Sequence, residues 1–308
     1  MYMEPEPYFP PPSPSLTRWW SKETVAVVTG GNKGIGFELV KQLAKEGLKV
    51  VLTARDTQKG EAALEALRSL GIGSNVHFLL LDVSDPISIT AFASSFKAKF
   101  GATLDILVNN AGVSFNELHE NSVEHAETVI NTNFYGPKLL IEALLPLFRS
   151  SPSSITRILN VSSRLGSLNK MRNEEMRAML QREDLLEEDI ENMVSMFLRD
   201  VRNGTWKSKG WPSYWTEYAM SKMALNAYSK VLAKRYSYNG SGLSVNCFCP
   251  GFTQTSMTKG QGTHTADHAA SFLSSLALLP PEQLPTGKFF SIGKKKKKST
   301  LLNISSKL

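Results

Sequence analysis

Cysteine is scarce in this sequence: only Cys247 and Cys249 occur among the 308 residues. Two cysteines cannot form the disulfide framework of a small secreted protein, and no cluster of histidine and cysteine accompanies them at the spacing of a zinc site. We therefore expect two buried free thiols, a reducing compartment and no bound metal.

Long apolar runs are also absent. No stretch approaches the roughly 18 residues that a transmembrane helix needs, and the N-terminus lacks the apolar core of a secretory signal. We expect a soluble cytoplasmic protein with no membrane partner. The last three residues, Ser306-Lys307-Leu308, match the peroxisomal address, so the peroxisomal matrix is the alternative location.

Acidic residues are missing from one end of the chain. Residues 294–308 contain six lysines and no acid, and removing these lysines lowers the formal charge from +7 to +1. The nearly neutral remainder gives no support for a nucleic-acid-binding surface. We expect the tail to be a solvated, disordered run, with a nuclear address or an acidic partner as the alternative.

Proline is concentrated near the other end, where residues 1–22 show no periodic apolar pattern. This composition predicts a disordered arm, with Trp19 and Trp20 packing where the fold begins. Residues 23–293 are then expected to form the folded domain.

A glycine-rich turn follows the first apolar run. Residues 25–29 predict a buried strand, residues 30–36 read Gly-Gly-Asn-Lys-Gly-Ile-Gly, and a helical pattern continues to about Glu46. Strand, glycine turn and helix together favour a phosphate site, because glycines admit a pyrophosphate and the helix N-terminus offers free N–H groups. The alternative is a tight turn without a ligand.

The second strand, residues 49–53, is followed by Arg55. A dinucleotide fold reads the adenosine ribose at this point, and an arginine there suits a 2′-phosphate. Arg55 together with Lys33 therefore favours NADP(H). The alternative is a surface ion pair between Arg55 and Asp56.

Strands and helices go on alternating, which predicts an α/β fold with a doubly wound, seven-stranded parallel sheet and helices on both faces. The further elements are expected at residues 57–70, 76–81, 86–100, 104–109, 123–149, 155–161, 243–248, 265–278 and 288–291. Pro137 should kink the helix at 123–149 or break one of its backbone bonds. Ligands of such sheets bind at the carboxyl ends of the strands, where the pattern places Gly30, Arg55, Asp82, Asn109 and Ser163.

Tyr218 and Lys222 are four residues apart and share one face of a predicted helix. An ammonium near a phenol lowers the phenol pKa, which would provide a proton donor for carbonyl reduction. The alternative is a surface tyrosine packed on a lysine stem. Tyr214 is a second phenol, but only Tyr218 has a lysine four residues later.

The segment at about 171–207 is rich in Met, Leu, Glu and Arg, and its apolar residues recur at helical spacing. It predicts two amphipathic helices whose methionines belong to the core. The aromatic residues at 211–215 have two interpretations, a wall of an apolar substrate pocket or ordinary packing at a helix start.

Together these motifs resemble the short-chain dehydrogenase/reductase family, over residues 24 to about 292. The matching motifs are Thr29-Gly30…Gly34-Ile35-Gly36, Asp82-Val83, Asn109-Asn110-Ala111-Gly112, Asn133, Ser163, Tyr218…Lys222 and Pro250-Gly251. The chain is most similar to the monomeric carbonyl reductases and to plant reductases of terpenoid and alkaloid ketones.

The resemblance implies roles for individual residues. Tyr218 is the implied proton donor, Ser163 holds the substrate oxygen, Lys222 binds the nicotinamide ribose, and Asn133 anchors a relay water. The loop after Pro250 is expected over the nicotinamide, although Gln254 stands where relatives commonly carry a basic residue. The implied NADP(H) contacts are Gly30, Asn32, Lys33, Gly34, Ile35, Gly36, Arg55, Asp82, Val83, Asn109, Tyr218, Lys222, Pro250, Gly251, Thr253 and Thr255.

The resemblance also implies an activity and an assembly state. The expected reaction is NADPH-dependent reduction of a small ketone or aldehyde, by a monomer whose inserted helices cover the face that others use for oligomers. Two alternatives are a catalytically idle NADP-binding protein with a basic interaction tail and a peroxisomal enoyl or acyl-CoA reductase. Relatives that reduce C=C bonds replace the tyrosine, so Tyr218 favours carbonyl chemistry.

Overall fold

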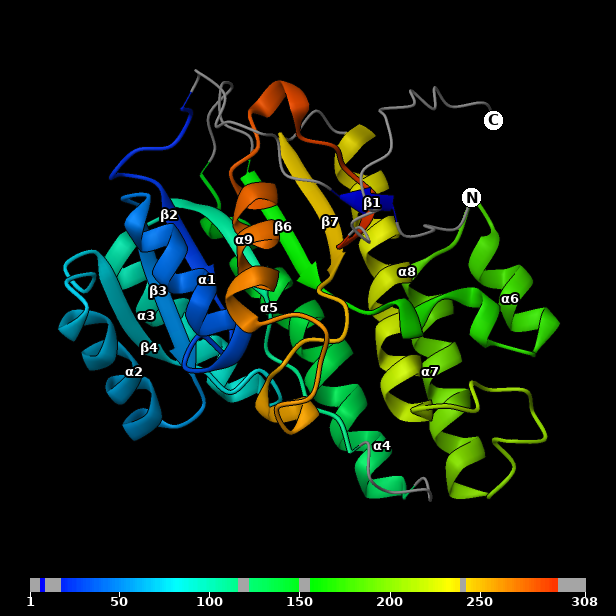
Figure 1. Ribbon diagram of the computed structural model, residues 1–308. Coiled ribbons are helices and arrows are strands. Elements are labelled where there is room, and N and C mark those ends of the chain that lie inside the picture. Colours follow the sequence, from blue (N-terminus) through cyan, green and yellow to red (C-terminus); the bar gives the residue numbers. More distant parts are fainter. Residues whose placement is uncertain (1–5, 9–17, 116–121, 150–155, 239–241, 293–308) are drawn as a thin grey trace, which may run out of the picture.

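The computed structural model describes residues 6–8, 18–115, 122–149, 156–238 and 242–292. These residues form a parallel sheet with helices on both faces (Figure 1) in the order β1-β8-β7-β6-β5-β2-β3-β4. The strands are β1 (Glu6–Tyr8), β2 (Val25–Val28), β3 (Lys49–Ala54), β4 (Val76–Leu80), β5 (Leu104–Asn109), β6 (Thr156–Val161), β7 (Leu243–Cys249) and β8 (Phe289–Ile292).

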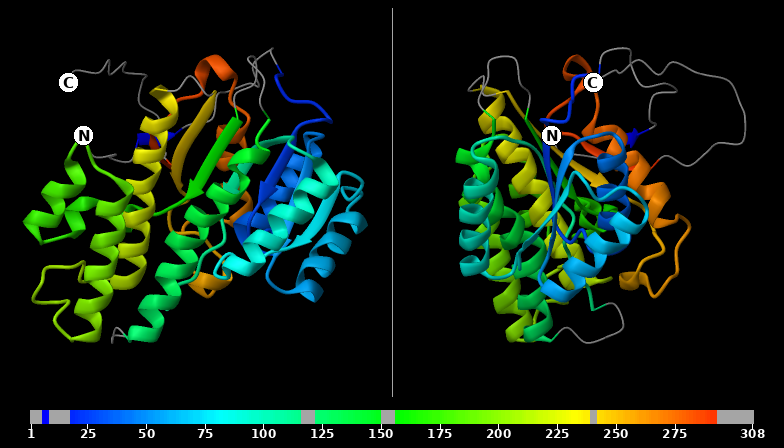
Figure 2. Two further views of the ribbon diagram at one scale, coloured as in Figure 1. Left: turned by 180° about the vertical axis from the view of Figure 1, so that it is seen from behind. Right: turned by 90° about the vertical axis from the view of Figure 1, so that its left-hand side faces the viewer.

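Helices cover both faces of the sheet (Figure 2), and an apolar layer lies on each face. One contains Leu39 and Leu273 from the α1 and α9 side, and the other contains Phe134 and Tyr228 from the α5 and α8 side. The helices are α1 (Gly34–Lys45), α2 (Thr57–Ser69), α3 (Pro86–Phe100), α4 (Val123–Ile130), α5 (Gly136–Leu144), α6 (Glu174–Gln181), α7 (Glu187–Arg202), α8 (Thr216–Tyr238) and α9 (Ala266–Ala277).

The chain winds in two directions from the middle of the sheet. From β2 it proceeds to β3 and β4, and from β5 it proceeds through β6 and β7 to β8. The neighbours β2 and β5 therefore form the switch point at which open α/β sheets bind ligands. All four residues of β2 are buried, as expected for an unbroken apolar strand covered on both faces.

The N-terminal arm differs from expectation at one place. Residues Glu6–Tyr8 pair in parallel with Phe290–Ile292 of β8 and add an eighth strand to the predicted seven. A proline-rich stretch gives no strand signal, but an open sheet edge supplies backbone partners to any extended segment. Trp19 packs on the core as expected, and its indole N–H donates to the Leu278 carbonyl at 3.1 Å.

The predicted helix at 123–149 forms, with the irregularity that Pro137 predicts. It divides into α4, a π-helical turn (Asn131–Tyr135), α5 and a short 3-10 turn (Leu145–Leu147). Pro137 has no N–H to donate to the Asn133 carbonyl, so the regular pattern of hydrogen bonds cannot pass this point. The turn places Asn133 beside α8, where α8 contacts it.

The inserted segment forms α6 and α7 as predicted, and α7 lies along α8 (Figure 1). Met176 and Met193 are buried in the core, which confirms their structural role. Trp211 is also buried, and its indole N–H donates to Asp200 at 2.8 Å. No helix in the described ranges combines the length and the apolarity that crossing a bilayer requires.

Candidate active site

Tyr218 and Lys222 lie one turn apart on α8, as predicted. The Lys222 ammonium is 5.5 Å from the centre of the Tyr218 ring and donates a hydrogen bond to the Val161 carbonyl at 2.9 Å. Lys222 is only 4% exposed, and burial lowers its pKa to about 8. The bond to Val161 fixes the ammonium at the carboxyl end of β6.

Ser163 follows β6 and reaches the same place. Its side chain lies beside Tyr218, and its Oγ accepts the Leu165 N–H at 3.1 Å, which caps a 3-10 turn (Arg164–Gly166). The sheet thus supplies the serine and α8 supplies the tyrosine. A hydroxyl pair of this kind can bond one substrate oxygen from two sides.

Gly166 is absent from the predicted site residues, yet it determines how closely this turn approaches α8. A methyl carbon at Gly166 would lie 2.5 Å from the backbone carbonyl carbon of Lys222 and 2.7 Å from the Met223 nitrogen. No side chain fits there, so glycine is required for the Ser163 turn to rest on α8.

The predicted direction of the Tyr218 pKa shift is wrong: the pKa is raised, and Lys222 is not among the causes of the shift. Burial is the largest influence on Tyr218 and raises its pKa, while the hydrogen bond with Ser163 lowers it to a smaller extent. The ammonium of Lys222 bonds to the Val161 carbonyl, and burial lowers the ammonium's own pKa. Tyr218 is therefore a phenol that holds its proton at neutral pH.

Asn133 is fully buried between the loop after β5 and α8. Its Oδ1 accepts the Val113 N–H at 2.9 Å, and its Nδ2 donates to the Val113 carbonyl at 2.9 Å and to Ser221 Oγ at 3.1 Å. A methyl carbon at Gly112 would lie 3.2 Å from Asn133 Oδ1 and 3.7 Å from Lys222 Nζ. Asn133 therefore holds the loop after β5 against α8, and its water-anchoring role stays a prediction.

The glycine turn between β2 and α1 has the shape of a phosphate cradle. Gly30 and Gly34 have φ values of +62° and +56°, and a methyl carbon at Gly36 would lie 2.5 Å from the Gly30 carbonyl oxygen. Lys33 is the N-cap of α1 and makes no side-chain cap, so the first N–H groups of the helix point outward uncapped. Asn32 and Ile35 lie in the same turn, which fits a pyrophosphate.

Thr29 and Asn110 were not predicted as site residues, but they lock this cradle in place. Thr29 Oγ1 accepts the N–H groups of Asn110 and Ala111, each at 2.9 Å. Asn110 Nδ2 in turn donates to the Thr29 carbonyl at 2.8 Å. The signal that could have found them is their position at the ends of two adjacent strands.

The Asn109 side chain lies between β5 and β6. Its Nδ2 donates to Asn160 Oδ1 at 2.8 Å, which ties β5 to β6 inside the sheet. The cofactor contact of Asn109 stays a prediction. Asp82 accepts the Ser84 N–H at 2.9 Å and the Ser84 hydroxyl at 2.6 Å, and Val83 is buried against Gly136.

Two exposed cations flank the end of β3. Neither Arg55 nor Lys33 has an ion pair among the described residues. Asp56, the alternative partner of Arg55, instead caps α2 by accepting the Lys59 N–H at 2.9 Å. The Gly31 N–H bonds to the Thr53 carbonyl at 2.8 Å and joins the glycine turn to this strand end. The unpaired cations fit a 2′-phosphate.

The loop after β7 bends at Gly251, where φ is +71°. Thr253 is buried and donates to the Pro250 carbonyl at 2.9 Å, so its hydroxyl serves the loop itself. Thr255 lies over the glycine turn, because a methyl carbon at Gly34 would be 3.5 Å from Thr255 Cγ2. Of the two predicted threonine contacts, Thr255 is the better placed for the cofactor.

The aromatic residues before α8 were expected either to wall an apolar substrate pocket or to pack at the helix start, and different residues fit each interpretation. Trp211 belongs to the core of the insertion, whereas Tyr214 is 63% exposed and stacks on Trp215. Trp215 meets the Tyr218 ring edge-on with 5.8 Å between the ring centres. Tyr214 and Trp215 therefore form an apolar surface next to the phenol of Tyr218.

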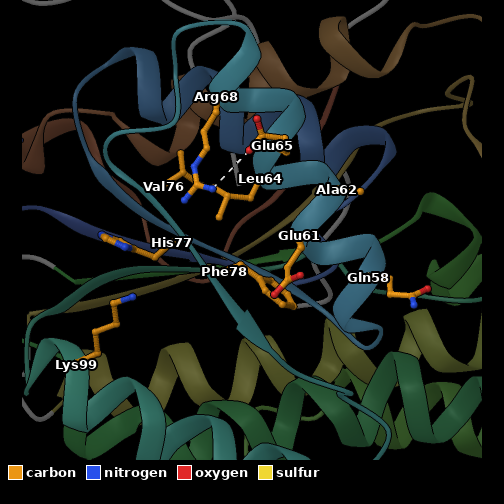
Figure 3. Close-up of a pocket in the computed structure, with 10 residues that line it drawn as sticks. All are labelled: Gln58, Glu61, Ala62, Leu64, Glu65, Arg68, Val76, His77, Phe78 and Lys99. Atoms are coloured by element: carbon orange, nitrogen blue, oxygen red, sulfur yellow. Dashed lines mark ion pairs between the residues drawn. The ribbon is translucent and has the colours of Figure 1, made fainter.

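A hollow of about 700 Å³ lies at the edge of the sheet, beside the edge strand β4 (Figure 3). Arg68 and Glu65 of α2, which are 3.5 Å apart, and His77 of β4 line it. None of the site residues lines this hollow, so it is separate from the site around Tyr218.

The doubly wound sheet, the glycine turn at its switch point and the Ser163–Tyr218–Lys222 cluster define a nucleotide-dependent oxidoreductase. The family profile described as short chain dehydrogenase matches residues 24–175 and 207–266, and the chain belongs to this family. The unmatched residues between these ranges fall within the predicted insertion.

The chain is similar to several named proteins, and each match covers nearly the whole length of the relative. The chain is 41% identical to (+)-neomenthol dehydrogenase of Arabidopsis thaliana, over 86% of this chain and 95% of the relative. The structure of salutaridine reductase from Papaver somniferum matches with a TM-score of 0.79 and 38% identity, over 87% of this chain and 99% of the other. Carbonyl reductase [NADPH] 1 of Mus musculus is 33% identical, over 87% and 96% of the two chains.

Proposed function

We propose that this protein reduces a small ketone or aldehyde to an alcohol with NADPH. The observation that carries the proposal is that Ser163 at the carboxyl end of β6, Tyr218 and the buried ammonium of Lys222 lie together. The names of relatives such as carbonyl reductase [NADPH] 1 and salutaridine reductase support it.

Bound NADPH supplies the hydride that the carbonyl carbon receives. The hydroxyls of Ser163 and Tyr218 bond the substrate oxygen and stabilise the negative charge that develops on it. Because burial raises the pKa of Tyr218, the phenol keeps its proton until that oxygen becomes strongly basic. The proton then passes from Tyr218 to the oxygen, and the product is the alcohol.

The same residues explain a preference for the phosphorylated cofactor. The uncapped N-terminus of α1 and the glycine turn would hold the pyrophosphate, and Arg55 and Lys33 would hold the 2′-phosphate. Thr255 would close the site from above the turn. Lys222, fixed by Val161, would face the nicotinamide ribose.

The substrate is proposed to be a small apolar carbonyl compound of the terpenoid or alkaloid type, because Tyr214 and Trp215 offer an apolar surface beside Tyr218. A panel of such ketones and aldehydes is tested by following the loss of NADPH absorbance. Turnover of at least one neutral ketone is expected. A protein that binds NADPH and consumes none with any carbonyl would be the idle binder, and turnover of enoyl compounds alone would indicate the C=C reductase.

We also propose a cytoplasmic monomer. α7 packs on both α4 and α8, and Arg202 of α7 pairs with Glu127 of α4 at 3.0 Å, so the insertion covers this face of the molecule. Sedimentation that shows a stable dimer would contradict the monomer. The lysine run and the peroxisomal address lie outside the described residues, and imaging of a fusion that leaves Leu308 free distinguishes cytoplasm from peroxisome.

A further inference from the structure

Trp215 directly precedes α8 and has an unusual backbone conformation. Its φ is +49°, and in the part of the chain that the structure describes only Trp215 and Lys259 combine a positive φ with a side chain. A bulky residue is disfavoured in this left-handed region, which glycine and asparagine accept more readily. A tryptophan held there stores backbone strain, and strain of this kind is typical of functional sites.

The segment around Trp215 is anchored on both sides. Before it, Trp211 is buried, and its indole N–H donates to Asp200 of α7 at 2.8 Å. After it, Thr216 is buried, and the Trp215 carbonyl accepts the Ala219 N–H at 2.6 Å, which closes the first turn of α8. These contacts impose the backbone path of residue 215. Glycine would follow the same path without strain, so the anchors give no reason for the tryptophan side chain.

The indole of Trp215 lies against the phenol of Tyr218. The two ring centres are 5.8 Å apart, and the ring planes meet at 78°. Lys222 Nζ is 5.5 Å from the centre of the same Tyr218 ring. Trp215 is three residues before Tyr218 and Lys222 is four residues after it, so the two lie one helical turn to either side on the same face. The phenol therefore has the indole as its neighbour toward one end of α8 and the ammonium toward the other.

Tyr214 holds the indole in its orientation. The rings of Tyr214 and Trp215 are stacked, with 5.6 Å between their centres and 22° between their planes. Stacked and edge-on aromatic pairs are both favourable contacts. The indole takes part in one contact of each kind, so its position relative to the phenol is fixed.

The position of the phenol matters for the rate. A proton donor must lie within hydrogen-bond reach of the oxygen that receives the proton, and a displacement of about 1 Å can lower a rate about 10²-fold. A side chain that restrains the Tyr218 ring therefore influences the reaction without touching the substrate.

We infer that Trp215 is a positioning residue for the proton donor. Its indole keeps the Tyr218 phenol aimed at the substrate oxygen, and the left-handed backbone of Trp215 places the indole there. The inference rests on the proposed reductase function and deepens it, because it adds a residue that acts through Tyr218.

The test removes the ring while keeping the backbone conformation. Trp215→Gly and Trp215→Asn replace the indole with residues that accept a positive φ, and Trp215→Phe keeps an aromatic ring. Trp206→Ala is the control, because it removes a half-buried indole that packs on the core from the insertion. kcat and KM are measured with NADPH for those carbonyl compounds of the panel that the wild type reduces, beginning with menthone and 4-nitrobenzaldehyde. NADPH affinity is measured by fluorescence titration.

We expect Trp215→Gly and Trp215→Asn to lower kcat by about tenfold or more, because the phenol is no longer restrained. Trp215→Phe should recover most of this loss, and Trp206→Ala should keep a kcat near the wild-type value. NADPH affinity should stay at the wild-type value in all variants, since the glycine turn lies on another element.

A double variant separates an effect through Tyr218 from any other effect. In Tyr218→Phe the phenolic proton is already lost, so adding Trp215→Gly should lower the remaining rate no further. If Trp215→Gly does not fold, Trp215→Asn takes its place in this comparison.

A wild-type kcat in folded Trp215→Gly and Trp215→Asn would overturn the inference while leaving the reductase function intact. The same fold loss in the Tyr218→Phe background as in the wild type would also overturn it. A higher KM for the carbonyl compound with an unchanged kcat would make Trp215 a wall of the substrate site and overturn its positioning role. Failure of the wild-type protein to reduce any member of the panel would contradict the proposed function itself, and the inference with it.

Discussion

Gly166→Ala should damage catalysis without touching substrate, cofactor or any reacting group. The added methyl carbon would lie 2.5 Å from the Lys222 carbonyl carbon and 2.7 Å from the Met223 nitrogen, both backbone atoms of α8 that cannot rotate away. The turn that carries Ser163 must therefore move. Overpacking of this kind costs about 1–3 kcal/mol of stability.

The larger effect is expected on the rate. A displaced Ser163 moves away from Tyr218, and the substrate oxygen then loses its second hydrogen-bond donor. Removal of one oxyanion donor typically lowers kcat by about 10²–10³. We therefore predict a kcat lower by at least about tenfold and an NADPH affinity close to the wild-type value, because Gly30 and Gly34 lie on another element.

Gly71→Ala is the matched control for Gly166→Ala. Gly71 has a φ of +73° and nothing within 4 Å of an added methyl carbon, so alanine there introduces backbone strain but no collision with the site. Its thermal unfolding should shift by a similar amount while kcat stays near the wild-type value. Wild-type kcat in folded Gly166→Ala would refute the structural argument.

Two further predictions concern the cofactor and the buried lysine. Arg55→Asp should raise KM for NADPH by about tenfold or more and raise KM for NADH far less, because a charged partner of the 2′-phosphate is lost; equal effects on both cofactors in steady-state kinetics would contradict it. The pKa of Lys222 is about 8 in the folded protein and about 10.4 in the unfolded chain. Between these pH values the unfolded chain binds more protons than the folded protein. The free energy of unfolding should therefore rise with pH across this range, by at most about 3 kcal/mol. Urea unfolding of Lys222→Met should lack this rise, and an unchanged pH dependence would show that Lys222 does not cause it.

Local pattern was sufficient for most of the fold and for the location of the site. Buried apolar strands that end in Gly30, Arg55 and Ser163 identify one edge of a parallel sheet, because successive strands of such a sheet present the same end. The four-residue spacing of Tyr218 and Lys222 fixes their common helix face. These features depend on neighbours in sequence or on topology, which a pattern can indicate.

Features that depend on tertiary contact were not predictable. Gly166 touches Lys222 across 56 positions, and nothing near Gly166 signals that approach. The predicted direction of the Tyr218 pKa shift was wrong because burial, which a single sequence does not show, raises this pKa and is the largest influence on it. Pro137 predicted an irregularity in the helix at 123–149. The π-helical turn that accommodates it depends on packing around Asn133, which the sequence alone does not show.

The most direct measurement compares the turnover of Tyr218→Phe with that of Tyr214→Phe. Each substitution removes one phenolic oxygen, and the two positions are four residues apart. The account predicts that Tyr218→Phe lowers kcat for a neutral ketone by about 10²–10⁴ while NADPH still binds, because the proton donor is lost and the cradle is intact. Tyr214→Phe should keep its turnover, since that side chain is 63% exposed. Full turnover by Tyr218→Phe would contradict the assignment of the proton to Tyr218.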